Sequence, residues 1–188
     1  MRVVNIDAPR NRDNFGSWLN TVKLLGTGVE VGALSGVYSK VILDSWIGQR
    51  LFLIDPWETQ PVEIYREDDG RFNHKGAYDQ ALELSKKDPR AILLKGLSAD
   101  VVHQFSNNTL DFVYIDANHA YENVFEDMTL WWEKVIPGGI LCGHDFYNCI
   151  KHPFYNQVQQ AVEDWSKQNG IDFCVTTECT SWWMPKPK

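Results

Sequence analysis

Acidic and histidine side chains follow several apolar segments of this sequence, at the points where each segment ends. Asp55 closes the run 51–55, Asp116 closes the run 111–116, and His144 and Asp145 lie near the end of the run 139–146. His119 follows Asp116 by three residues. An imidazole can take a proton from a reacting group, and carboxylates supply oxygen ligands to a divalent cation. The pattern predicts His119 or His144 as a general base, a Mg²⁺ or Ca²⁺ site shared by Asp116 and Asp145, or both.

A glycine turn precedes these residues in the stretch VEVGALSGVYSKVIL, residues 29–43, where a strand carrying Glu30 is followed by a helix. Gly32 and Gly36 allow the backbone to approach a ligand closely, and the first N–H groups of the helix favour an anion. The dinucleotide fingerprint requires the pattern G-x-G-x-x-G, which the spacing Gly32-x-x-x-Gly36 does not provide. The turn therefore favours a ligand without a pyrophosphate, and a purely structural turn is the alternative.

Asp55 lies 25 residues after Glu30, at the end of the second apolar run. An acidic residue at this point of an α/β fold accepts hydrogen bonds from the two hydroxyls of a ribose. Together with the glycine turn, Asp55 favours an adenosine-containing ligand. The alternative is that Asp55 only caps the end of its strand.

Short apolar runs alternate with segments of helical spacing along the chain. The runs are GVEVG (28–32), LFLID (51–55), AILL (91–94), DFVYID (111–116) and GILCGHDF (139–146). Such strands, separated by helices, are typical of a parallel sheet that is covered on both faces, and ligands bind beyond the carboxyl ends of its strands. Two closing runs, 171–177 and 180–185, predict an antiparallel hairpin.

Two details of the helices are also predicted. Apolar residues from Tyr121 to Val135 repeat at helical spacing, and the Pro-Gly-Gly triplet at 137–139 is expected to stop that helix. Ser98 is expected to be the N-cap of a short helix over 98–105.

Composition and charge limit the function classes. The 188 residues suffice for one domain, predicted to span 1–188, and the net charge of −7 argues against a nucleic-acid partner. The sequence has no apolar stretch long enough to span a membrane and no N-terminal signal pattern. Its four cysteines form no C-x-x-C pair, so we expect reduced thiols and a cytoplasmic protein (Cys142, Cys149, Cys174 and Cys179).

The motifs together resemble a known family. Glu30 to Gly36, LFLIDPW, and above all IDANHAYENVFEDMTLWWEKVIPGGILCGHDF are similar to class I S-adenosylmethionine-dependent methyltransferases, in the group called methyltransferase domain family 24, related to macrocin and catechol O-methyltransferases. The most specific part is the pattern D-x-x-H-x-Y-x-x-V-x-x-D, followed by a Pro-Gly-Gly turn. The resemblance covers residues 28–146, and it implies a Rossmann-like three-layer sandwich whose seven-stranded sheet is mostly parallel, with an antiparallel last strand.

The resemblance also implies roles for individual residues. The turn from Gly32 to Gly36 would lie under the methionine part of the cofactor, Asp55 would bind the ribose, Ser98 would lie beside the adenine, and Asp116 would face the methionine amino group or a metal ion. The implied cofactor-binding set is Glu30, Gly32, Ala33, Leu34, Ser35, Gly36, Asp55, Ser98 and Asp116.

For the reaction, the resemblance implies O-methylation of a small molecule, in which the acceptor hydroxyl must lose its proton. The catalytic residues would be His119, His144 and Asp145, with Asp116 and Asp145 as ligands of Mg²⁺ or another divalent cation. The metal-dependent relatives place a further Asp or Asn next to the second acid, whereas here the neighbours are His144 and Phe146. This departure makes a transition metal an alternative to Mg²⁺.

Three alternatives remain at the level of sequence. A non-catalytic protein that binds S-adenosylmethionine would need the same turn and the same acids. An NAD-dependent oxidoreductase is disfavoured by the missing third glycine and by the absence of a Tyr-x-x-x-Lys pair. An N-methyltransferase acting on nucleic-acid bases is disfavoured because DANH stands where an N-P-P-Y type motif is expected. We expect a small-molecule acceptor and no nucleic-acid or membrane partner, and a homodimer is open.

Overall fold

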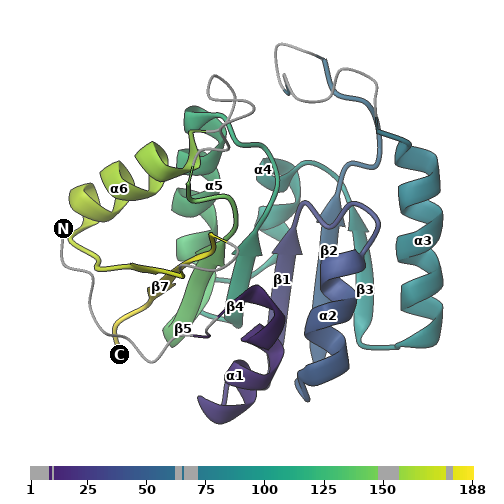
Figure 1. Cartoon of the computed structure of the whole chain (residues 1–188), viewed down its shortest axis with the longest axis horizontal. Helices are drawn as coiled ribbons and strands as arrows, with labels where there is room; N and C mark the ends of the chain where they lie inside the picture. The colour runs from purple at the N-terminus through teal and green to yellow at the C-terminus, as the bar shows by residue number, and fades with distance from the viewer. Residues whose placement is uncertain (1–8, 10, 62–64, 66–71, 148–156, 177–179) are drawn as a thin grey trace.

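The computed structural model describes residues 9, 11–61, 65, 72–147, 157–176 and 180–188. Strands and helices alternate along most of the chain (Figure 1). The strands are β1 (Thr27–Val31), β2 (Arg50–Asp55), β3 (Ala91–Lys95), β4 (Leu110–Ile115), β5 (Val135–Gly143), β6 (Cys174–Val175) and β7 (Trp182–Pro185). The helices are η1 (Arg12–Asn14), α1 (Phe15–Thr21), α2 (Val37–Ser45), α3 (His74–Lys87), α4 (Ser98–Val101), η2 (Val102–Gln104), α5 (Tyr121–Trp132) and α6 (Val158–Asn169).

The seven strands form one sheet in the order β3-β2-β1-β4-β5-β7-β6. The pairs among β1 to β5 are parallel, and β7 runs antiparallel to both β5 and β6. The predicted α/β fold with an antiparallel last strand is therefore confirmed, and so is the closing hairpin. The strand order reverses direction beside β1, because β2 and β3 lie on one side of it and β4 and β5 on the other. This is the point where ligands bind in open α/β sheets.

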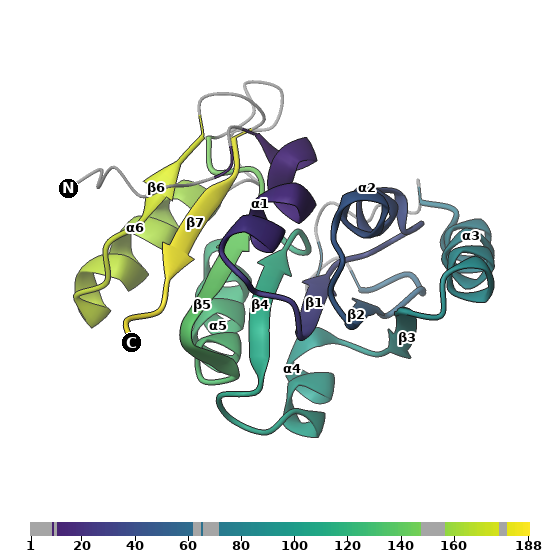
Figure 2. The same ribbon diagram turned by 90° about the horizontal axis from the view of Figure 1, so that it is seen from below.

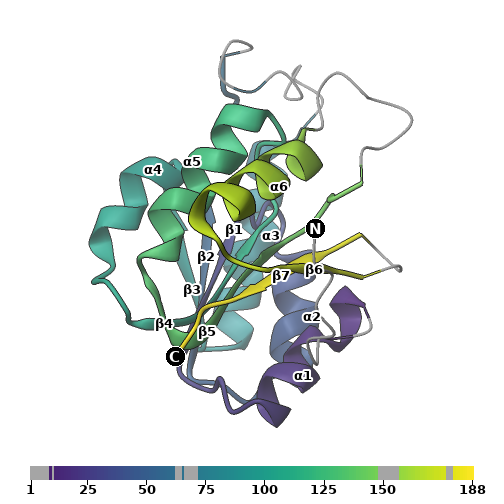
Figure 3. The same cartoon turned by 90° about the vertical axis from the view of Figure 1, so that its left-hand side faces the viewer.

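Helices cover both faces of the sheet and complete the three layers. Helices α1 and α2 pack on one face, and α4, α5 and α6 pack on the other (Figures 2 and 3). Side chains alternate between the faces along β1, so Val29 and Val31 join the core under α5 and α6. Glu30 points to the opposite face, where it meets Ser39 of α2.

The Pro-Gly-Gly triplet does not act as predicted. Helix α5 ends at Trp132, and residues 137–139 lie inside strand β5, which already begins at Val135. The strand accommodates them by an irregularity, because Leu110 pairs with Val135 but Phe112 pairs with Ile140. Gly138 has a φ of +83° and donates its N–H to the carbonyl of Lys186. The triplet is thus a bulge in a strand and not the stop of a helix.

The carboxyl ends of the parallel strands are tied together by backbone hydrogen bonds. Gly32 and Ala33 donate to the carbonyl of Ile54, and Asp116 donates to that of Val31. His144 donates to the carbonyl of Ile115 in the same way. The residues that follow each strand are therefore held in fixed positions along one edge.

Two further predictions concern the cysteines and membranes. Cys142 and Cys174 are free thiols, whereas Cys149 and Cys179 lie outside the described residues. Among the helices described, none combines the length and the apolar character that crossing a membrane requires.

Candidate active site

A cavity of about 540 Å³ opens at the carboxyl edge of the sheet. Four segments that follow strands line it: the β1–α2 turn, the residues after β2, the β3–α4 loop and the β4–α5 loop. The first turns of α5 close one wall. Of the residues predicted from sequence, the cavity brings together Glu30, Gly32, Ala33, Leu34, Ser35, Asp55, Ser98, Asp116 and His119.

The floor of the cavity at β1 is the glycine turn. Gly32 has a φ of +87°, and a side chain there would overlap the carbonyl oxygen of Asp116 on the neighbouring strand. Only glycine satisfies both the backbone angle and the close approach. Gly36 is not among the lining residues. It is the N-cap of α2 with a φ of +74°, so its role is to turn the chain into the helix.

Asp55 lines the cavity at the end of β2 and is held by backbone amides. Its Oδ2 accepts a hydrogen bond from the N–H of Leu34 at 2.9 Å, and its Oδ1 accepts one from the N–H of Trp57 at 2.7 Å. The indole N–H of Trp57 donates in turn to the carbonyl of Leu34 at 2.6 Å. Asp55 therefore caps its strand end as well as lining the cavity. A carboxyl oxygen can accept more than one hydrogen bond, so a bond to a backbone N–H does not by itself exclude one to a ligand hydroxyl.

A second acid, Glu30, lies under the glycine turn. It is buried, and its side chain accepts a hydrogen bond from the hydroxyl of Ser39. Burial raises the pKa of Glu30 to about 8, and the Ser39 hydrogen bond only partly opposes this. Glu30 is thus a largely neutral carboxyl at neutral pH.

Arg12, which the sequence analysis did not single out, contributes a cation to the cavity wall. Its Nη1 lies 3.6 Å from Oδ2 of Asp116, and its guanidinium lies 4.0 Å from the ring centroid of Tyr38. The hydroxyl of Tyr38 donates to the backbone carbonyl of Arg12 at 3.0 Å, which fixes the N-terminal segment over α2. Since Arg12 precedes the first strand and follows no strand end, the pattern of strand ends gave no signal for it.

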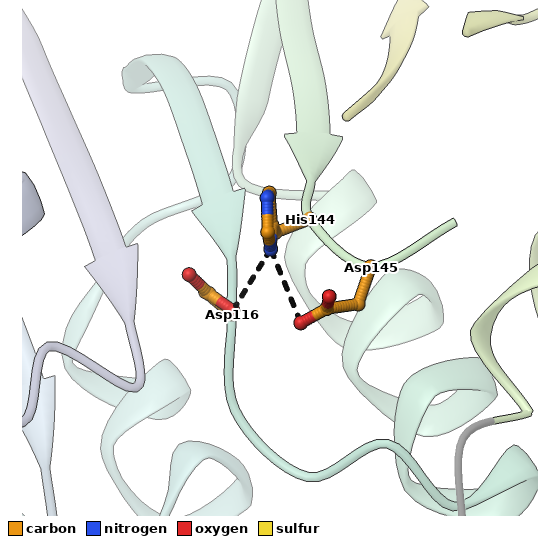
Figure 4. Close-up of side chains that lie close together, drawn as sticks. All are labelled: Asp116, His144 and Asp145. Carbon is orange, nitrogen blue, oxygen red and sulfur yellow. Dashed lines mark ion pairs between the residues drawn. The ribbon is translucent and has the colours of Figure 1, made fainter. Parts of the chain in front are cut away.

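Asp116, His144 and Asp145 meet where β4 and β5 end (Figure 4). Nδ1 of His144 lies 3.1 Å from Oδ2 of Asp145 and 3.9 Å from Oδ1 of Asp116. Nε2 of His119 lies 3.1 Å from the same Oδ2 of Asp145. The structure therefore brings the three predicted catalytic residues together, with Asp145 between two imidazoles. Asp116 and His119 line the cavity, whereas His144 and Asp145 are not among the described residues that line it.

The pKa values of the two carboxyls in this cluster, Asp116 and Asp145, are shifted in opposite directions. Burial acts to raise the pKa of Asp145, but the hydrogen bonds from His119 and His144 outweigh it and hold that pKa below the ordinary value. Burial raises the pKa of Asp116, although His144 and Arg12 oppose the shift. Opposite shifts of two neighbouring carboxyls are characteristic of functional sites.

The donor atoms of this cluster also fit a metal ion. One ligand atom each from Asp116, His144 and Asp145 can be chosen so that all three lie within 4.8 Å of one another. The set is two carboxylate oxygens and one imidazole nitrogen. Mg²⁺ and Ca²⁺ prefer oxygen ligands alone, whereas a mixed set suits Mn²⁺, Fe²⁺, Co²⁺ or Zn²⁺.

At the opposite end of the cavity, Ser98 takes a different role from the predicted cap. Leu97 is the N-cap of α4, and Ser98 is the first residue of that helix. The hydroxyl of Ser98 donates to Oδ1 of Asp127 and accepts the indole N–H of Trp131 at 2.8 Å. Asp127 lines the cavity too, and burial raises its pKa to about 7. Asp127 was not predicted as a site residue, although it is the final acid of the pattern D-x-x-H-x-Y-x-x-V-x-x-D.

Comparison with protein families gives one decisive match. A family model described as "Methyltransferase domain" matches residues 29–146, the part of the chain that carries the glycine turn and the ends of β1, β2, β4 and β5. The chain belongs to this methyltransferase domain family. It is an S-adenosylmethionine-dependent methyltransferase, as the resemblance implied, and not a nicotinamide-dependent oxidoreductase. A search of the curated proteins gives no significant match.

Solved structures agree on the fold. A structure titled as a putative caffeoyl-CoA O-methyltransferase from Staphylococcus aureus aligns with a TM-score of 0.66 at 15% identity, covering 97% of this chain and 86% of that one. An O-methyltransferase from Bacillus cereus in complex with S-adenosylhomocysteine gives 0.64 at 16%, covering 99% and 84%. The O-methyltransferase NovP gives 0.63 at 17%, covering 90% and 75%. At these identities the likeness establishes the fold.

The methyltransferase site fits its cofactor, S-adenosylmethionine. The backbone of the glycine turn lines the cavity, and Asp55 places a carboxyl beside it, at the position for sugar hydroxyls. Asp116 also supplies a carboxyl to the cavity, where Arg12 lies 3.6 Å from it.

Proposed function

We propose that this methyltransferase transfers the methyl group of S-adenosylmethionine to a hydroxyl oxygen of a small-molecule acceptor. The observation that carries the proposal is the placement of Asp145 between two imidazoles, one of which, His119, lines the same cavity as Asp55 and the glycine turn. A hydroxyl acceptor needs a group that takes its proton, and this cluster supplies one. The titles of three solved structures with the same fold name O-methyltransferases, which supports this choice.

The cofactor is arranged along the carboxyl edge in this proposal. Asp55 accepts hydrogen bonds from the ribose, the turn from Gly32 to Ser35 lies under the methionine part, and Asp116 faces the methionine ammonium. Bound S-adenosylmethionine supplies a methyl group on a sulfonium, a leaving group that needs no further activation. The protein therefore has to align the acceptor and remove its proton.

The proton acceptor in this scheme is His119, and Asp145 is its positioning residue. Nε2 of His119 is the ring nitrogen that lies 3.1 Å from Asp145. When Nε2 carries the proton and donates to the carboxylate, Nδ1 is the basic nitrogen of the neutral ring. An ionised Asp145 thus selects the tautomer and stabilises the imidazolium that forms.

Metal binding is a second way to remove the proton of the acceptor hydroxyl. It would use Nδ1 of His144, the atom that contacts Asp145. Nδ1 of His144 either donates to Asp145 or coordinates a cation, because it cannot carry a proton and a metal at once. With a metal held by Asp116, His144 and Asp145, the acceptor hydroxyl would lose its proton through coordination. The donor set then favours a transition metal over Mg²⁺.

A methyl-transfer assay tests the proposal. The protein is stripped of metal with EDTA and incubated with S-adenosylmethionine and a panel of phenols, catechols and sugars, and S-adenosylhomocysteine formation is measured. Turnover that survives EDTA and falls in His119→Gln supports the histidine base, and turnover restored by Mn²⁺ or Zn²⁺ supports the metal. Tight S-adenosylhomocysteine binding with no turnover on any hydroxyl would instead indicate a non-catalytic binding protein.

We also propose the partners and surroundings that the sequence favours. A net charge of −7 fits a diffusible acceptor better than a nucleic acid. The free thiols of Cys142 and Cys174 fit a reducing compartment such as the cytoplasm. A single domain over 1–188 and a homodimer stay predictions, which limited proteolysis and analytical ultracentrifugation would check.

A further inference from the structure

Asp127 is a buried carboxyl that the proposed reaction does not use. It lies on α5 with 6% of its surface exposed, and it lines the cavity. Its Oδ1 accepts the hydroxyl of Ser98, which itself accepts the indole N–H of Trp131. Within the described residues, Oδ2 of Asp127 has no hydrogen-bond partner. A carboxyl oxygen of a buried residue that faces a cavity and has no partner in the protein is available to accept a hydrogen bond from a ligand.

The sheet order defines which part of a ligand this oxygen can meet. Asp116 and Asp145 follow β4 and β5, Asp55 follows β2, and Ser98 follows β3 at the far side of the edge. A ligand with its reactive group at Asp116 and its sugar at Asp55 therefore extends its third part toward the β3–α4 loop and α5. In an adenosine ligand that third part is the base.

The hydrogen bonds of Ser98 exclude it as the main polar contact for the base. A hydroxyl has one proton to donate, and the Ser98 proton is directed to Asp127. One of its two lone pairs already accepts the indole N–H of Trp131. Ser98 thus orients Asp127, and Asp127 presents the acceptor.

We infer that Asp127 determines base specificity: its Oδ2 accepts a hydrogen bond from the exocyclic amino group of adenine, with Ser98 and Trp131 holding the carboxyl in place. This inference rests on the cofactor arrangement proposed above. A carboxyl oxygen distinguishes the amino group from a hydrogen or a carbonyl at the same position of the purine, because only the amino group donates. Ser98 is accordingly a positioning residue and not the direct partner of adenine.

A binding experiment with two ligands tests the inference without requiring turnover. Isothermal titration calorimetry measures the dissociation constants of S-adenosylhomocysteine and of its analogue that carries hydrogen in place of the amino group at purine C6. At pH 8, above the pKa of about 7 that burial gives Asp127, the wild-type protein should bind S-adenosylhomocysteine about 10- to 100-fold more tightly than the analogue, the range for a hydrogen bond to a charged group. In Asp127→Ala this ratio should fall to about one. Asp127→Asn should also lower the ratio, because its single oxygen accepts from Ser98 and its NH2 group cannot accept from the adenine amino group.

The matched control is Glu122→Gln, which removes one negative charge from an exposed position of the same helix. It should leave the ratio of the two dissociation constants as in the wild type. If Asp127 only holds α4 against α5, Asp127→Ala should lower the affinity for both ligands equally and leave the ratio unchanged. That result would overturn the inference.

Two outcomes remain decisive if Asp127→Ala fails to fold by circular dichroism. In a crystal structure of the wild-type complex with S-adenosylhomocysteine, an amino nitrogen within about 3.2 Å of Oδ2 supports the inference, and one beyond about 4 Å overturns it. Failure of the wild-type protein to bind S-adenosylhomocysteine at all would overturn the proposed cofactor arrangement together with the inference. Tight binding of S-adenosylhomocysteine by the wild-type protein, with equal affinity for the analogue, would overturn the inference alone.

Discussion

Asp55 and Asp145 lie at the same edge of one sheet, but they are held in different ways. Asp55 is fixed by the backbone N–H groups of Leu34 and Trp57. Asp145 is fixed by the side chains of His119 and His144. Backbone donors keep their protons at every accessible pH, whereas imidazoles gain and lose them near neutrality. The donor end of the cavity, named for the methyl donor and formed by Asp55 and the glycine turn, is therefore held by the backbone. The reaction end, formed by Asp145, His119 and His144, is held by side chains that can change their protonation state.

Because of this difference, substitutions should be able to change cofactor affinity and turnover separately. The backbone N–H groups that hold Asp55 neither titrate nor exchange for a metal ion near neutral pH, so they should position this carboxyl in the same way across conditions. The imidazoles of His119 and His144 can give up their contact with Asp145 to a metal ion, or transfer a proton to the Asp145 carboxyl. Changes at the reaction end should consequently alter turnover and spare binding, and changes at the donor end should alter binding or folding.

The largest effect is expected for Asp145→Asn. The amide keeps the shape, but it no longer stabilises a charged imidazole or binds a cation well, so turnover should fall about 10²- to 10⁴-fold. Asp145 has a φ of +53°, a region that Asn tolerates well, so the backbone should not be disturbed. S-Adenosylhomocysteine affinity, measured by calorimetry, should stay within about twofold. An equal loss of affinity and turnover would contradict a separate reaction end.

At the donor end, Gly32→Ala should destabilise the protein by about 3 kcal/mol or more in urea unfolding. The new Cβ would require a left-handed backbone at φ +87° and would overlap the backbone carbonyl of Asp116, which the sheet holds in place. Gly170→Ala is the matched control. Gly170 also has a positive φ, +66°, but no atom lies within 4 Å of its added Cβ. That variant should lose only about 1 kcal/mol, and equal losses would show that the close approach contributes nothing.

The donor end was also easier to predict from the sequence. Gly32 and Asp55 are local signals: each directly follows an apolar strand, and parallel strands bring such residues to one edge. The same logic found Asp116, His144 and Asp145, because β4 and β5 are neighbours. The mostly parallel sheet and its antiparallel last strand followed from the family resemblance and the closing hairpin.

What the sequence did not reveal depends on packing between distant elements. Arg12 reaches Asp116 only because Tyr38 holds the N-terminal segment over α2. Asp127 faces the cavity because α5 lies against α4, which no spacing within α5 encodes. The Pro-Gly-Gly triplet was misjudged for a related reason. These residues often end helices, but a strand can absorb them as a bulge when its neighbours supply hydrogen bonds.

Glu30→Gln probes a group of the donor end that does titrate, and its effect should depend on pH. The folded-state pKa of Glu30 is about 8, whereas an unfolded Glu has about 4.3. Between these values the folded protein binds one proton more than the unfolded chain, so this group lowers stability as pH rises. Glu30→Gln should remove that slope. Relative to the wild type, it should gain on the order of 2–3 kcal/mol at pH 8 compared with pH 5.

Urea unfolding of both proteins at several pH values checks the Glu30 prediction, and the difference between the two curves isolates this residue from other titrating groups. Ser39 can still donate to the amide oxygen of Gln, so the packing is preserved. Parallel curves for the two proteins would show that Glu30 is already ionised at neutral pH.

The smallest effect is expected for Asp55→Ala, measured as a loss of S-adenosylhomocysteine affinity of about 1–3 kcal/mol, the scale for hydrogen bonds to a charged group. The substitution also releases the N–H groups of Leu34 and Trp57, which could loosen the turn without any contact to the sugar. An S-adenosylhomocysteine analogue without ribose hydroxyls separates these causes. If Asp55 binds the sugar, the wild-type protein should prefer the natural ligand and Asp55→Ala should bind both alike. A preference that survives the substitution would mean that Asp55 only shapes the turn, and the hydroxyls would then have to be bound elsewhere on this edge.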